Sequence, residues 1–119
     1  MPNIRSTDVM AASTIVPNVV AGSAYEFLRT PARVQVWITQ EAGAALGDVT
    51  AQVQFGPEVA LEVSDVPTEI AAGRGPITDD PPLSDEIVAA GDRILLRLTN
   101  TDAAAPHTAR TIVRIVNLA

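Results

Sequence analysis

The chain has 119 residues, of which 47% are hydrophobic and 18% charged, so it can bury the core of one domain without disulfides. Its formal net charge of −6 argues against nucleic-acid binding, because an acidic chain repels a phosphate backbone. The absence of cysteine excludes disulfides and thiolate sites, and no apolar run approaches the roughly 20 residues of a membrane-spanning helix.

The first twenty residues predict an extended N-terminal arm. They contain Pro2 and Pro17 and show no clear periodicity before residue 14, where a short strand over residues 14–20 is expected. A second short strand is predicted over residues 25–28, and the Thr-Pro pair that follows ends it.

The clearest strand signal lies between residues 32 and 64, where apolar and polar residues alternate with a period of two. Most of the apolar positions are valine or isoleucine, whose branched side chains favour a pleated sheet. This pattern predicts strands over residues 32–39, 49–55 and 58–64.

Residues 65–82 form the longest irregular region and are rich in proline, glycine, aspartate and threonine, with a brief strand suggested over residues 69–72. An irregular segment of this length is uncommon in a compact domain and is typically functional. Residues 87–90 lead into a turn at residues 90–92, alternation resumes over residues 93–99, and residues 108–118 are predicted to form the final strand.

Seven or eight short strands, with turn signals between them and no helical periodicity, predict an all-β fold. We expect one antiparallel β-sandwich domain over residues 21–119, preceded by the arm over residues 1–20. A partly closed barrel is the main alternative architecture.

Histidine occurs once, at position 107, in the predicted loop before the last strand. A Ser-His-Asp site would have to combine it with a serine such as Ser64 or Ser84, and neither lies in a nucleophile-elbow sequence. We therefore interpret His107 as a solvated loop residue and expect neither a catalytic site nor a cofactor.

Two features in or just after the irregular region could indicate ligand sites. Asp79, Asp80, Asp85 and Glu86 could bind Ca²⁺ or act as acid and base, but the EF-hand spacing is absent. A solvated acidic loop is the favoured interpretation. The glycine-rich run at residues 73–76 lacks the lysine and the strand-loop-helix context of a phosphate-binding loop, so it is not interpreted as one.

The outward positions of several predicted strands combine arginine with large apolar side chains, whereas the outer face of a monomeric sandwich is typically polar. Trp and Arg are also enriched at the energetic centres of interfaces. We therefore predict a subunit interface, opposite the acidic loop of a neighbour, in which a charged residue at position 37 would dissociate the assembly without unfolding it. The predicted interface residues are Arg33, Trp37, Arg93, Leu95, Arg97, Ile112, Arg114 and Val116.

The closing part of the chain has the order turn, strand, Asn/Thr/Ala-rich loop and last strand, over residues 90–101 and 108–118. In this respect the chain resembles small virion structural proteins, especially bacteriophage capsid-associated and decoration proteins. The resemblance implies a jelly-roll-like sandwich at a capsid surface that forms a symmetric homo-oligomer and contacts other virion proteins. It implies no catalytic residues.

The leading hypothesis is therefore a non-catalytic structural protein of a virus particle. The alternative is a ligand-binding sandwich of the carbohydrate-binding or adhesion type. Sugar sites normally contain stacked aromatic rings, and the chain has only Tyr25, Phe27, Trp37 and Phe55. Aromatic residues gathered at one loop end would favour the alternative, whereas a broad apolar side face would favour assembly.

Overall fold

The computed structural model describes residues 3–23 and 25–118, and within these ranges it contains eight strands and no helix. The strands form two four-stranded sheets, which confirms the predicted β-sandwich. They are β1 (Asn3–Met10), β2 (Ile15–Val16), β3 (Ala32–Gln40), β4 (Val49–Phe55), β5 (Glu58–Asp65), β6 (Ser84–Val88), β7 (Ile94–Asn100) and β8 (His107–Asn117).

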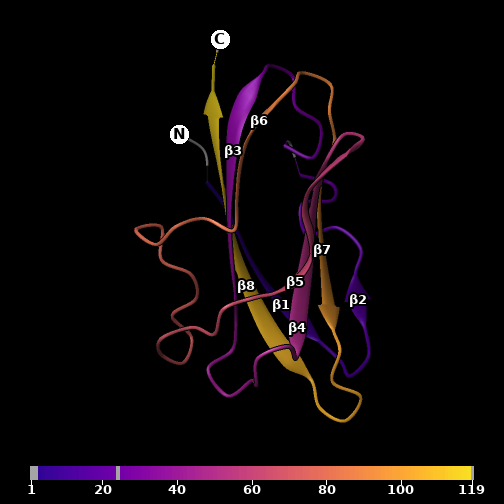
Figure 1. Cartoon of the computed structure of the whole chain (residues 1–119), viewed down its shortest axis with the longest axis vertical. Helices are drawn as coiled ribbons and strands as arrows, with labels where there is room; N and C mark the ends of the chain where they lie inside the picture. The colour runs from indigo at the N-terminus through magenta and orange to yellow at the C-terminus, as the bar shows by residue number, and fades with distance from the viewer. Residues whose placement is uncertain (1–2, 24, 119) are drawn as a thin grey trace.

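The strand order is β1-β8-β3-β6 in one sheet and β2-β7-β4-β5 in the other, and every pair is antiparallel. The first strand pairs with the last, the second with the second-last, the third with the third-last, and the two middle strands pair together. One long hairpin folded over on itself produces this nesting, which is the jelly-roll arrangement of eight strands in two sheets. Figure 1 shows the two sheets edge-on, with β8 and β3 on one side and β7 and β4 on the other.

The core lies between the sheets and is built from alternate residues of their central strands. Val34 of β3 lies opposite Ile115 of β8, and Val53 of β4 lies opposite Leu96 of β7; all four side chains are completely buried. Each such side chain stabilises the folded state by about 1.5–3 kcal/mol relative to exposure. Aliphatic packing therefore holds the sheets together, in keeping with the period of two in the sequence.

The sequence predicted the long strands well and the N-terminal third poorly. Residues 3–10 of the predicted arm form β1, and every residue of β1 pairs with a residue of β8. The strand expected over residues 14–20 is reduced to β2, and residues 25–28 contribute only a single bridge between Phe27 and Arg93. No strand forms over residues 69–72, although the nearby Thr68 makes a bridge with Gln40.

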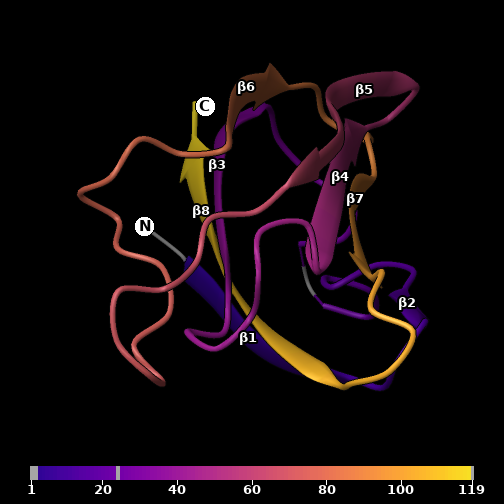
Figure 2. The ribbon, with the colours of Figure 1, turned by 60° about the horizontal axis from the view of Figure 1, so that its bottom comes forward.

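The connection between β5 and β6, residues 66–83, lies along the outer face of the β1-β8-β3-β6 sheet, where both views show it on the side away from the other sheet (Figures 1 and 2). Three backbone hydrogen bonds attach it to β3, from Gln40 N to Pro67 O, from Glu69 N to Gln40 O, and from Leu83 N to Val36 O. We call this connection the covering loop. Within the part of the chain that the structure describes, no helix is long and apolar enough to cross a membrane.

Candidate functional site

The residues of the predicted interface lie on two opposite faces of the sandwich. Three cross-strand pairings, Arg33 with Val116, Gln35 with Arg114 and Trp37 with Ile112, fall on the outer face of the β1-β8-β3-β6 sheet. Leu95 and Arg97 alternate with buried residues of β7 and so lie on the outer face of the other sheet, with Arg93 just before that strand. The predicted residues therefore do not form one continuous surface.

Trp37 and Ile112 are not exposed, which corrects their prediction as surface residues. They retain only 4% and 2% of their accessible area. The covering loop packs over Trp37, which lines a small hollow together with Asp80 and Leu83 of that loop. Trp37 Nε1 donates a hydrogen bond of 2.8 Å to the carbonyl of Asp80, and the Arg114 guanidinium lies 5.1 Å from the centre of the indole ring. Trp37 and its cross-strand neighbour Ile112 thus form a second, small core on the outer face of this sheet, with the covering loop over Trp37.

The predicted acidic cluster is dispersed in the structure. Asp79 and Asp80 are exposed in the covering loop, whereas Asp85 lies in β6 and forms a bidentate pair with Arg33, at 2.6 and 2.8 Å. This pair lowers the pKa of Asp85 below its ordinary value. Among the described residues these carboxylates do not gather into a group that could hold a metal ion, so the calcium hypothesis gains no support.

Glu69 of the covering loop holds residues 73–75 of that loop in place. Its carboxylate accepts hydrogen bonds from the backbone N–H groups of Ala42, Gly73 and Gly75 and from Arg110 Nη1 of β8. Gly75 has a φ of 70°, and a Cβ atom there would lie 3.1 Å from Arg110 Cδ, so only glycine fits without strain. The glycine-rich run therefore does cradle an anion, but the anion is a side chain of the same chain.

This cradle predicts a loss of stability in acid. Burial alone would raise the pKa of Glu69, but the N–H donors of Gly75 and Gly73 and the charge of Arg110 outweigh it, so its pKa is lowered. The carboxylate stabilises the fold above its unfolded pKa of roughly 4.3, and this contribution disappears as the pH falls through the lower folded pKa. We expect urea midpoints of the wild type and of Glu69→Gln to differ at neutral pH and to converge in acid. A constant difference would contradict this.

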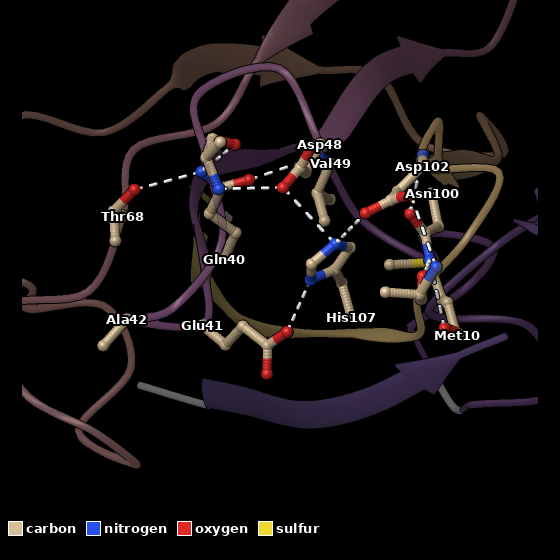
Figure 3. A network of polar contacts seen from close by, with 12 residues as sticks. Met10, Gln40, Glu41, Ala42, Asp48, Val49, Thr68, Asn100, Asp102 and His107 are labelled. Atoms are coloured by element: carbon tan, nitrogen blue, oxygen red, sulfur yellow. Dashed lines mark hydrogen bonds and ion pairs between the residues drawn. The ribbon is translucent and has the colours of Figure 1, made fainter. Parts of the chain in front are cut away.

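Figure 3 shows the His107 side chain between three carboxylates. Its Nδ1 lies 2.5 Å from Glu41 Oε1, while its Nε2 lies 2.9 Å from Asp102 Oδ2 and 3.3 Å from Asp48 Oδ2. Glu41 and Asp48 are the first and last residues of the β3–β4 loop, whereas Asp102 lies within the β7–β8 loop and His107 follows that loop as the first residue of β8. Two loops at one end of the sandwich therefore meet at a single imidazole.

The interpretation of His107 as a solvated loop residue is wrong, since the residue is 8% exposed and begins β8. Its hydrogen bonds to Asp102 and Glu41 raise its pKa, against the effect of burial. Neither Ser64 nor Ser84 is among its hydrogen-bond partners within the described residues, so the arrangement offers no Ser-His-Asp nucleophile. The alternation of β8 could have revealed that the His107 side chain points inward. Residues 109, 113 and 115 occupy alternate positions on the same face of that strand and belong to the core.

Two buried amide side chains hold the loops around His107 (Figure 3). Gln40 Nε2 donates to Ala45 O and its Oε1 accepts from the Val49 N–H, which fixes both ends of the β3–β4 loop. Asn100 Nδ2 lies within hydrogen-bond distance of the carbonyls of Met10, Ala11 and Ala105, and its Oδ1 accepts from the Asp102 N–H. The site is therefore built on fixed backbone, and neither amide was identified from the sequence.

One side of the sandwich leaves apolar side chains uncovered. β5 and β6 are the edge strands of their sheets and lie next to each other there (Figure 2). Val59 and Ile87 are 42% and 72% exposed and line a common hollow of about 160 Å³ together with Glu58 and Glu86. We call the surface formed by Glu58, Val59, Glu62, Val63, Glu86 and Ile87 the β5–β6 edge surface.

A second hollow, of about 350 Å³, lies next to the segment before β3. Tyr25 and Phe27 line it together with Arg29, Thr30 and Asn117. Phe27 is 57% exposed and lies 5.9 Å from the Arg93 guanidinium, which in turn pairs with Glu26 at 2.7 Å. Two aromatic rings thus gather at one loop end, as a ligand-binding module would require.

Comparison with known proteins assigns no family to the chain. No family model matches the sequence, and no curated protein matches it significantly.

Proposed function

We propose that the protein is a non-catalytic structural component of a virus particle, of the bacteriophage capsid-associated or decoration type, and that it forms a symmetric homo-oligomer. The jelly-roll strand order carries this proposal, because the arrangement is shared by viral capsid domains. Lectin domains and cupins share this strand order as well, so the proposal of a capsid role also depends on the exposed surfaces of the domain.

The β5–β6 edge surface supports self-association. An edge strand exposes unpaired N–H and C=O groups, and exposed apolar side chains beside it favour contact with another chain. The surface also carries Glu58, Glu62 and Glu86, and none of them forms an ion pair with another described residue.

The complementary charge is present on the same chain. Arg5 and Arg114 lie on the outer face of the β1-β8-β3-β6 sheet, away from the β5–β6 edge, and have no ion-pair partner among residues 3–23 and 25–118. A neighbour's acidic edge could meet these arginines, and repetition of such a contact between unlike surfaces forms a ring when the rotation between successive copies closes. The partner we propose for this surface is therefore a second copy of the chain.

A matched pair of substitutions tests this surface. Ile87→Asp places a charge on the β5–β6 edge surface, whereas Ile70→Asp makes the same change at a covering-loop residue of nearly equal exposure, 73% against 72%. We expect native mass spectrometry to find that Ile87→Asp is monomeric and Ile70→Asp remains assembled. Equal masses for the two variants would exclude the edge as the contact.

The hollow lined by Tyr25 and Phe27 favours a second candidate function, that of a ligand-binding module of the carbohydrate-binding type. The exposed Phe27 ring and the half-buried Tyr25 ring lie beside polar side chains there, and a sugar face with its hydroxyl groups requires such a combination. A glycan array that gives binding by the wild type but not by Phe27→Ala would favour this function over assembly.

A further inference from the structure

The atoms around His107 have the spacing of ligands on one metal ion. His107 Nε2 lies 2.9 Å from Asp102 Oδ2 and 3.3 Å from Asp48 Oδ2, and ligand atoms of all three residues lie within 4.8 Å of one another. Ligands held at the usual 2.0–2.2 Å from Zn²⁺ are themselves roughly 3–3.5 Å apart. We propose that His107, Asp48 and Asp102 form a binding site for a divalent metal ion of the zinc type.

Glu41 supplies the orienting contact that such a histidine requires. Its Oε1 lies 2.5 Å from Nδ1, where a carboxylate accepts an Nδ1–H, and Nε2 is the nitrogen that faces the two aspartates. Metal-bound histidines almost always donate their second N–H to a carboxylate or carbonyl group, which fixes the tautomer. Glu41 is therefore a positioning residue, and the other three are the ligands.

The aspartates are held in place by the backbone of their own loops. Asp48 Oδ2 accepts a hydrogen bond of 2.8 Å from the Ala45 N–H, and Asp102 Oδ1 accepts one of 2.8 Å from the Ala104 N–H, leaving Asp102 Oδ2 toward His107. The Thr101 N–H donates to Asp48 O at 2.8 Å and so ties the two loops together. Metal binding would thus require little rearrangement.

Charge and access also favour a cation. Three carboxylates surround one imidazole, and no arginine within residues 3–23 and 25–118 forms an ion pair with any of them. The Asp48 and Asp102 side chains are 25% and 26% exposed, so an ion can enter from the carboxylate side and retain water.

The ligand types determine the class of metal. One imidazole nitrogen and two carboxylate oxygens suit Zn²⁺ and related first-row ions, whereas Ca²⁺ takes six to eight oxygen ligands, which this site does not offer. The bound ion would connect the β3–β4 and β7–β8 loops and stiffen that end of the sandwich.

The single histidine makes a direct test available. In a chain free of any histidine tag, ¹⁵N NMR reports one imidazole, and isothermal titration with ZnCl₂ reports the stoichiometry. We expect one Zn²⁺ per chain, a metal-dependent shift of Nε2, and a proton retained on Nδ1. An imidazole that stays protonated on both nitrogens at saturating Zn²⁺ would show that the cluster is only an ion-pair network and would overturn the proposal.

Isosteric substitutions distinguish the residues that bind Zn²⁺ directly from those that do not. Asp102→Asn keeps the Oδ1 that accepts the backbone hydrogen bonds and should fold, yet it should lose Zn²⁺ binding. Glu41→Gln should weaken binding by about ten-fold, and Asp79→Asn, in the covering loop, should leave it unchanged. Should Asp102→Asn not fold, Asp48→Asn replaces it. Zn²⁺ binding of wild-type affinity in a folded Asp102→Asn or Asp48→Asn variant would contradict the site.

Discussion

Trp37→Ala is expected to lower the free energy of unfolding by about 3–5 kcal/mol, the usual cost of deleting a large buried aromatic side chain. The indole is 4% exposed and is covered by the loop over residues 66–83, so its loss leaves a cavity between the loop and β3. It also removes the hydrogen bond to Asp80 O. This expectation replaces the prediction from the sequence, in which a substitution at position 37 dissociates subunits without unfolding them.

Urea denaturation followed by circular dichroism measures the effect, and limited trypsin digestion locates it. Arg74 is the only basic residue of the covering loop and is exposed, so cleavage after it should accelerate if the loop detaches. Trp37→Phe is the matched control, since it retains a ring but not the N–H donor and should cost only about 1–3 kcal/mol. If Trp37→Ala kept a wild-type urea midpoint, Trp37 would not be part of a packed core.

Glu69→Ala is expected to lower the free energy of unfolding by about 3 kcal/mol, because removing one partner of a buried ion pair leaves the other groups without compensation. The Glu69 side chain is 2% exposed, and its loss would free the N–H groups of Gly73 and Gly75 as well as the Arg110 guanidinium.

The control for Glu69→Ala is Asp79→Ala, which removes an exposed carboxylate from the same covering loop and should change stability by less than about 0.5 kcal/mol. Chemical denaturation at neutral pH compares the two variants. Similar midpoints for both would show that the cradle contributes little, and would imply that packing at Trp37 holds the covering loop.

The central strands could be predicted because each carries a local signal. Val34 and Val36 on β3, and Ile94 and Leu96 on β7, lie at alternate positions and all face the core. The pairing of strands far apart in the chain has no such signal, and the match of Asn3 with Arg114 in β1 and β8 is an example. The sandwich was therefore predictable, whereas the place of the N-terminal segment within it was not.

The prediction that Trp37 is exposed was wrong for a related reason. Alternation correctly placed Trp37 on the outer face of its sheet, but an outer face becomes solvent-exposed only if nothing covers it. The covering loop has no periodicity, and its path depends on contacts such as the one between Glu69 and Arg110. Contacts between residues this far apart in the sequence cannot be derived from composition or spacing.

The His107 cluster could have been found in part. The histidine lies on the same face of β8 as core residues of that strand, which indicates an inward side chain. Its three carboxylate partners, however, lie 66, 59 and 5 positions away in the sequence. Only the fold brings Glu41, Asp48 and Asp102 to the same imidazole.

Sedimentation velocity on the wild-type chain over a wide concentration range tests self-assembly most directly. We expect one closed species, such as a trimer or pentamer, that persists on dilution and is lost in Ile87→Asp. A monomer at every concentration would contradict self-association through the β5–β6 edge surface.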